Sequence, residues 1–169
     1  MKRQIKFRAW DEVTKAMYQV RDIDFLADMK INSIRLVVCI QTSEDDIEFD
    51  FPIRRNGEYE LMQFTGLQDK NGVDIYEGDI LKIQYFKVAL GQNLGVTEVE
   101  AELKGVIEIY PLALVLKNIT GEKWCEYTGY DQGEGECKIF HLHDVYEDSS
   151  DAEYQIEIIG NIHQNPELL

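Results

Sequence analysis

The chain has 169 residues, of which 44% are hydrophobic, and it carries a formal net charge of -15. A chain of this length can bury a sizeable core as one large domain or two small ones, and 7 Phe, 9 Tyr and 2 Trp predict a folded protein. The negative charge disfavours direct binding to nucleic acid or an anionic membrane surface, because such binding depends on cationic side chains that displace counterions.

The cysteines and the amino terminus indicate a reducing compartment. Cys39, Cys125 and Cys137 are odd in number and widely spaced, unlike a disulfide framework, and are expected to act as small core residues. Charged residues interrupt each apolar run of the first ten residues, which is not typical of a signal peptide. No apolar run approaches the ~18–20 residues of a membrane-spanning helix. We therefore expect a cytoplasmic protein.

The first forty residues predict four strands. Residues 4–9 alternate apolar and charged side chains, as a half-buried strand does, and residues 17–20 are expected to return as its hairpin partner after a polar turn at 10–15. Residues 21–29 fit a strand or a short helical turn, and we favour the strand. Residues 34–40 are rich in β-branched side chains, which predicts a largely buried strand.

Residues 41–50 are polar and acidic, which predicts a solvated loop. Phe49, Phe51 and Ile53 alternate with Asp50 and Pro52, and this pattern indicates an edge strand because proline cannot donate to a β-ladder. A turn and a further strand are then expected at 54–57 and 59–64.

The most strongly patterned part of the chain is residues 64–81, which read FTGLQDKNGVDIYEGDIL. Asn71 and Gly72 tolerate positive φ and predict a tight turn. Glu77, Gly78 and Asp79 indicate a second turn, from which a strand is expected to leave over residues 80–86. A domain boundary is expected near residue 65.

The remaining residues predict short strands separated by turns. We expect strands at 96–103, 105–110, 114–117, 124–127, 138–143 and 154–159, with loops at 89–95, 129–135 and 146–152. The fold class is therefore mainly β with minor helix (α+β), comprising a β-rich part over residues 1–64 and an SH3-like β-barrel part with a carboxy-terminal tail over residues 65–169.

The best metal-like cluster is Cys137, His141 and His143, with Asp144 adjacent and Cys125 placed to lie across a hairpin. Residues 137, 141 and 143 share one face of a strand, and zinc accepts His and Cys in tetrahedral geometry. Because the spacing matches no strong zinc signature, we favour a packed cysteine and histidines paired with carboxylates. We assign no metal or cofactor.

Carboxylates could instead hold magnesium in a hydrolase, either Glu44, Asp45, Asp46, Glu48 and Asp50 or the pair Glu77 and Asp79. We favour structural roles, because the first group lies in an expected loop with only Arg54 and Arg55 nearby and the second lies in a turn.

The glycines at 66, 72 and 78 lack the Gly-Lys-Ser/Thr ending of a phosphate-binding loop. No catalytic or cofactor-binding residue is assigned, and we expect that the protein is not an enzyme.

Three segments together resemble the YopX family of phage and prophage proteins. They are Ile5–Asp11 with Met17 and Tyr18, Phe64–Gly72 leading into Ile75–Ile80, and Glu157–Leu169. The resemblance spans nearly the whole chain, with residues 85–150 less distinctive. It implies a mostly β fold with an SH3-like part, a homo-oligomer, and an accessory protein of a phage or prophage in the cytoplasm of a bacterial host. It supplies no catalytic residues.

Three functions remain open on the sequence. The leading hypothesis is a non-enzymatic, self-associating module that binds another protein, for which the abundant aromatic residues speak. The second is an acidic DNA mimic or a decoy for a host protein, motivated by the charge of -15 and the acidic tracts at 44–50 and 146–153. The third is a metal-dependent hydrolase, which is supported only by the Cys/His and carboxylate clusters described above.

Overall fold

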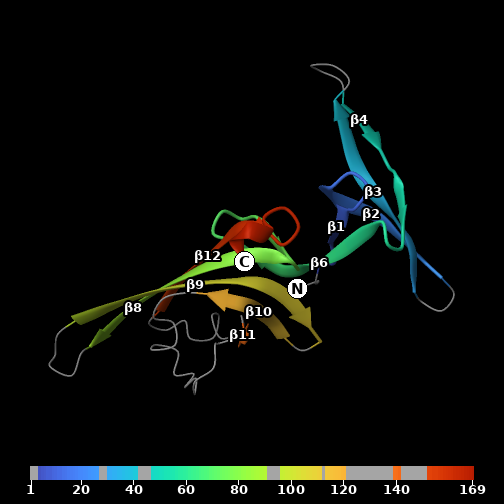
Figure 1. Ribbon diagram of the computed structural model, residues 1–169. Helices are drawn as coiled ribbons and strands as arrows, with labels where there is room; N and C mark the ends of the chain where they lie inside the picture. The colour runs from blue at the N-terminus through green and yellow to red at the C-terminus, as the bar shows by residue number, and fades with distance from the viewer. Residues whose placement is uncertain are drawn as a thin grey trace. The chain divides into compact units, whose positions relative to one another are not determined.

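The computed structural model describes residues 4–26, 30–41, 47–90, 96–111, 113–120, 139–141 and 152–169. Its elements are strands apart from one 3-10 turn in this part of the chain, which confirms the mainly β fold class (Figure 1). By their internal contacts the residues divide into two compact units, Met1–Phe64 and Thr65–Leu169. No helix of the described residues is long and apolar enough to cross a membrane.

The first unit is an antiparallel sheet with the strand order β4-β3-β2-β1-β6, in which β5 also pairs with β3. The predicted hairpin is confirmed, since β1 pairs with β2 through Ala9 and Tyr18. Strand β6 continues past Phe64 into the second unit. The bounds are β1 Phe7–Asp11, β2 Ala16–Phe25, β3 Ile31–Gln41, β4 Ile47–Asp50, β5 Ile53–Arg55 and β6 Tyr59–Gln68.

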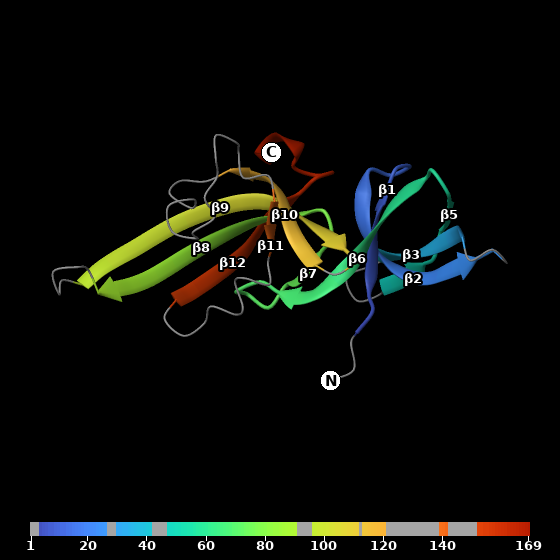
Figure 2. The same cartoon turned by 90° about the horizontal axis from the view of Figure 1, so that it is seen from below.

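This sheet bends back on itself, because its outer strands β5 and β6 are successive in the chain (Figure 2). β5 pairs with β3 and β6 pairs with β1, while a tight turn at residues 56–58 joins the two. Gly57 has a φ of 89° in this turn, a conformation that favours glycine, and the Glu58 N–H donates to the Arg55 carbonyl at 3.0 Å. One face of the bent sheet is thereby enclosed.

The enclosed face carries the core of the first unit. Ala9, Ile34 and Leu36 are buried there, each from a strand on which alternate residues point inward. Partly buried apolar side chains pack around them, namely Tyr18, Val20, Ile23, Ile31, Tyr59 and Leu61.

A buried ion pair between Asp11 and Arg54 links β1 to β5, two strands that are not neighbours in the sheet. Arg54 Nε lies 2.7 Å from Asp11 Oδ1 and Arg54 Nη2 lies 2.8 Å from Asp11 Oδ2. Asp11 is fully buried and the Arg54 side chain is 15% exposed. The pair therefore links β5, at one edge of the bent sheet, to β1, which lies next to β6 at the other edge.

These positions correct two predictions. Trp10 and Asp11 were expected to begin a turn, but they are the last residues of β1, and the turn occupies residues 12–15. Arg54 was expected in a turn, but it lies in β5 with its side chain facing Asp11. Alternation explains both, because Asp11 shares the inward side of β1 with Ala9 and Arg54 pairs across from the buried Ile34.

Further hydrogen bonds complete the surroundings of Asp11. The Thr14 hydroxyl donates to Oδ2 at 2.8 Å, and the Val13 N–H donates to Oδ1 at 3.1 Å. Burial by itself raises the pKa of Asp11, but the hydrogen bonds from Arg54, Thr14 and Val13 outweigh it and hold the pKa below its ordinary value. The carboxylate is thus charged and satisfied inside the unit.

The second unit contains a five-stranded antiparallel sheet with the order β11-β10-β9-β8-β12, and β7 pairs with β6. Figure 1 shows β8 and β9 as a long hairpin. The described pairings establish no closure of this sheet, so the SH3-like barrel stays a prediction. The bounds are β7 Asp74–Tyr76, β8 Asp79–Leu90, β9 Val96–Tyr110, β10 Ala113–Thr120, β11 Ile139–His141, β12 Ala152–Asn161 and the 3-10 turn Pro166–Leu168.

The core of this unit lies on one face of that sheet. Register places Ile83 opposite both Leu103 and Ile156, and Ile107 opposite Leu116. Its buried members are Ile75, Leu81, Ile83, Leu103, Ile107, Leu116 and Ile156. On the opposite face Lys82 pairs with Glu102 at 2.7 Å, while Ile80, Val106 and Val115 on that face are also buried. The opposite face therefore combines charged pairs with buried apolar side chains.

Several predicted bounds change in the structure. Residues 47–50 form β4 instead of a loop, because they pair with β3 from Val38 to Gln41. The two strands expected at 96–103 and 105–110 are a single strand, since Lys104 and Gly105 keep register with β8. Predictions for residues 42–46, 91–95, 121–138 and 142–151 lie outside the described residues.

The ion pair generates the first testable expectation. Replacing Arg54 by Met leaves the Asp11 carboxylate buried without its partner, and we expect a loss of about 3–5 kcal/mol in the free energy of unfolding. The matched control is Arg55→Met on the same strand, where the side chain is exposed and the change should stay within about 0.5 kcal/mol. Urea unfolding measures both, and equal effects would show that the pair does not hold the unit closed.

Candidate functional site

The patterned residues 64–81 form two tight turns on either side of β7. In the first turn, between β6 and β7, Asp69 is the organising residue. Its Oδ1 accepts hydrogen bonds from the Asn71 and Val73 N–H groups at 2.8 and 2.9 Å, while its own N–H donates to the Val73 carbonyl at 2.9 Å. Gly72 has a φ of 80°, as the predicted Asn71-Gly72 turn requires.

The environment of Asp69 stabilises its charged form. Burial raises the pKa of Asp69, but the hydrogen bonds from the Val73 and Asn71 N–H groups and the Asn71 side chain outweigh it, so the pKa is lowered from its ordinary value. Both carboxylate oxygens accept from groups of the turn, because Oδ2 lies 3.3 Å from Asn71 Nδ2. This carboxylate therefore stabilises the turn.

The second turn joins β7 to β8 through Glu77 and Gly78, as predicted. Asp79 is almost fully buried, and its Oδ2 accepts the Tyr76 N–H at 2.8 Å. Gly78 has a φ of 79°, and its N–H donates to the Ile107 carbonyl at 2.9 Å, which fastens the turn to β9.

Asn161, the last residue of β12, connects this turn to the carboxy-terminal segment. Its Nδ2 lies 3.0 Å from the Gly78 carbonyl and 3.4 Å from Asp79 Oδ1. Its Oδ1 accepts the His163 N–H at 3.0 Å, which starts the turn after β12. One buried amide thus bridges the central and terminal segments of the chain.

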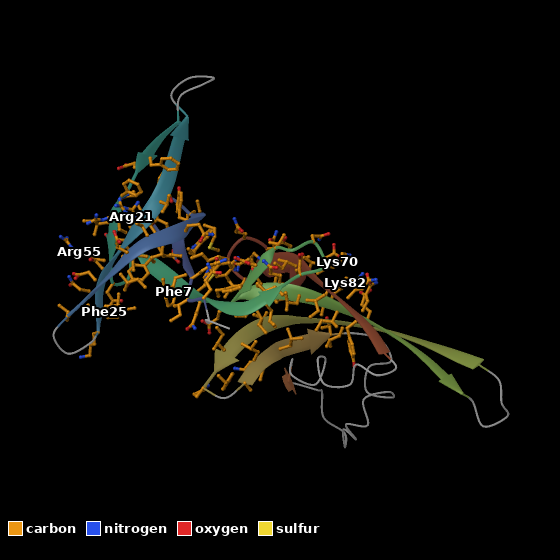
Figure 3. All side chains as sticks on the ribbon, turned by 180° about the vertical axis from the view of Figure 1, so that it is seen from behind. Phe7, Arg21, Phe25, Arg55, Lys70 and Lys82 are labelled. Carbon is orange, nitrogen blue, oxygen red and sulfur yellow. The ribbon has the colours of Figure 1, made fainter. Side chains whose placement is uncertain are left out.

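Two further contacts join the same segments. The Lys70 N–H donates to the Ile156 carbonyl at 2.8 Å, and Lys70 Nζ lies 2.6 Å from Glu157 Oε2 on β12; Figure 3 labels Lys70. Gly160 allows a close approach of the 3-10 turn, because a Cβ there would lie 2.8 Å from Leu168 Cδ1 and 2.9 Å from Asn165 Oδ1. The two segments form one packed cluster.

We name this cluster the turn cluster and define it as Thr65, Asp69, Gly78, Asp79 and Asn161. Its polar side chains are buried, and each has a described hydrogen bond to backbone, Thr65 through donation to the Ile75 carbonyl at 2.8 Å. Oxygens that accept backbone N–H groups are committed to the turns. The cluster's described chemistry is therefore structural, and it sets the ends of β7, β8 and β12.

The candidate metal cluster around Cys137 falls almost entirely outside the described residues. His141 lies in β11, where its backbone pairs with Val115, but its side chain is not among those the structure describes. Cys125, Cys137, His143 and Asp144 lie outside the described residues altogether. The zinc hypothesis therefore remains untested.

Among the predicted carboxylates, Asp79 and Asp50 take local structural roles. Asp79 serves the turn described above, and the Asp50 carboxylate is exposed and accepts the Phe51 N–H at 2.8 Å. Glu77 lies 3.5 Å from the Ile109 N–H on β9. Glu44, Asp45 and Asp46 fall outside the described residues, as does the side chain of Glu48.

Sequence reasoning missed the two residues on which the buried polar contacts depend most, Asp11 and Asn161. A signal existed for Asp11, because it continues the inward alternation of Phe7 and Ala9. For Asn161 the signal was its position beside Gly160 at the end of an apolar strand, a place where amides commonly satisfy backbone groups.

Acid should weaken the protein partly through Asp69. Because the pKa of Asp69 is lowered by folding, its contribution to stability is present above the ordinary carboxyl pKa near 3.8 and is lost as the pH falls through the folded value. We expect the Asp69→Asn variant to show a shallower fall in unfolding free energy below pH 4, by up to one proton or about 1.4 kcal/mol per pH unit. Urea unfolding at several pH values measures the slope, and identical slopes would exclude this role.

Removing the Asn161 amide should loosen both segments that it joins. We expect Asn161→Ala to cost about 2–3 kcal/mol in unfolding free energy, because buried partners of a lost side chain remain unsatisfied. Asn32→Ala is the matched control, since the Asn32 side chain makes one exposed hydrogen bond, to Asp24 at 2.9 Å, and should cost less than about 0.5 kcal/mol. A cost for Asn161→Ala as small as the control's would contradict a structural turn cluster.

Comparison with known proteins places the chain in a family. It is similar to the crystal structure of protein EF1440 from Enterococcus faecalis, with 27% identity, 99% of each chain covered and a TM-score of 0.49. No curated protein matches the chain. The family model described as YopX protein matches residues 6–169, which include the whole turn cluster. The chain therefore belongs to the YopX family.

Proposed function

We propose that the protein is a non-enzymatic, self-associating module that binds protein surfaces and serves as a phage- or prophage-encoded accessory factor in the host cytoplasm. The observation that carries this proposal is the commitment of the turn cluster to backbone hydrogen bonds. The most patterned residues of the chain then specify a scaffold, and the activity is left to the surface that the scaffold presents.

That surface exposes large apolar side chains. Solvated apolar residues are ordinary when they are scattered, but aromatic and aliphatic side chains that gather on a sheet face favour a protein interface. Among the described residues the exposed ones include Phe49 and Ile53 near the edge of the first sheet, and Val73 and Tyr110 in the second unit. Contact with another protein surface would remove them from water.

The described charges do not favour the decoy hypothesis. A DNA mimic needs carboxylates in rows that imitate phosphates, whereas three carboxylates of the second unit are paired with lysines. Glu102 contacts Lys82, Glu108 contacts Lys117 at 2.6 Å, and Glu157 contacts Lys70. Such pairs reduce the local negative potential.

Self-association of a chain with a charge of -15 should depend on salt in a defined direction. Two like-charged copies repel over a Debye length of ~30 Å at 0.01 M salt but only ~8 Å at 0.15 M. We expect light scattering behind size exclusion to show a larger mass at higher protein concentration, and a stronger shift at the higher salt. A monomer under all these conditions would overturn the proposal.

A further inference from the structure

The first unit has a second sheet face, opposite to its core. Register fixes the two faces, because Ile34 and Arg54 pair on the core side while the next pair, Arg35 and Ile53, points the other way. We call the part of this second face around β3 and β5 the outer face. Its side chains used below are Arg21, Asp22, Arg35, Phe49, Phe51 and Ile53, and register places Asp24 and Arg55 on the same side.

The outer face combines exposed apolar groups with charges of both signs. Phe49 is 58% and Ile53 is 55% exposed. The Arg21 guanidinium lies 4.1 Å from the centroid of the Phe51 ring, a cation–π contact that holds the ring beside the charge. Figure 3 labels Arg21 in this unit.

Asp22 balances part of the positive charge of the two arginines. It lies 3.5 Å from Arg21 and 3.7 Å from Arg35, and all three side chains are about half exposed. Exposed pairs of this kind contribute little to the stability of one chain. They are therefore available to exchange partners when another surface approaches.

The charge of the whole chain is distributed unevenly between the two units. Residues 1–64 carry ten Lys and Arg against twelve Asp and Glu, a net charge of -2, whereas residues 65–169 carry seven against twenty, a net charge of -13. Two copies that met through their second units would face the strongest repulsion. The outer face carries three arginines and two aspartates, so two copies can approach through it without this repulsion.

We propose that the outer face is the surface through which a second copy of this chain docks, with the same face contributed by both copies around a two-fold axis. This inference rests on the self-association proposed above and names its surface. A two-fold contact requires a self-complementary patch. The outer face meets that requirement, because its apolar side chains can pack against the same side chains of the second copy. Its arginines can also pair with Asp22 of that copy.

The test measures the dimer dissociation constant by sedimentation equilibrium for the full chain. The double variant Phe49→Ser/Ile53→Ser should raise this constant at least tenfold. The matched control is Val13→Ser/Val73→Ser, which removes two side chains that are 62% and 52% exposed at other places and should leave the constant within twofold. Equal effects of the two double variants would overturn the outer face as the docking surface.

A second variant keeps the test independent of packing at the apolar residues. Arg35→Glu changes a side chain that is 43% exposed and makes the outer face net negative, so two such faces should repel and the dissociation constant should rise at least tenfold at low salt. Raising the salt should recover part of the loss. If the wild-type chain associates but both Arg35→Glu and Phe49→Ser/Ile53→Ser leave its dissociation constant unchanged, this inference alone is overturned. A wild-type chain that never associates would instead remove the proposed self-association.

Discussion

The hydrogen bonds that the Asn161 amide donates to the Gly78 carbonyl and the Asp79 carboxylate are the constraint on which the second unit depends. They fix where β8 begins relative to where β12 ends, and Asp79 and Asn161 are also the last register pair between those strands. A one-residue slip would carry Ile156 away from the apolar core, so the core itself disfavours it. A two-residue slip would keep each side chain on its face of the sheet, and the buried polar contacts of Asn161 exclude that slip.

The first unit uses a buried carboxylate in a similar way. Asp11 and Arg54 stand on strands that are separated in the sheet order, and their two hydrogen bonds link β5 at one edge of the bent sheet to β1 near the other. Replacing such a pair by apolar side chains is often neutral, whereas removing one partner is costly because the other charge is left buried and unpaired. In both units a carboxylate beside a turn or sheet end satisfies groups that would otherwise be buried unpaired.

Much of this fold could be predicted from short-range patterns. The turns at Gly72 and Gly78 followed from residues that accept positive φ, and the β1–β2 hairpin followed from period-2 alternation. Long-range pairing could not be predicted in this way. No local pattern around residue 54 predicts that Arg54 pairs with Asp11. Residues 47–50 were predicted as a loop because the pairing of β4 with β3 is made by backbone groups, which the side-chain pattern does not reveal. The turn cluster was missed as a unit because Asn161 lies 82 residues from Asp79.

These contacts also explain how residues 64–81 can be strongly patterned for structural reasons. Asp69 and Asp79 resemble site residues by type, but their oxygens accept backbone N–H groups, and the proposed function assigns recognition to exposed side chains such as those of the outer face. The most direct measurement is native-state hydrogen exchange at the Tyr76 and Val73 amides, whose acceptors are the Asp79 and Asp69 carboxylates. If the turn cluster is scaffold, both amides should exchange only by large-scale opening, with protection close to that of the neighbouring core strands. Exchange at the rate of an unstructured loop would show that the Asp69 and Asp79 carboxylates do not hold the turns. Both carboxylates would then again be candidate functional-site residues.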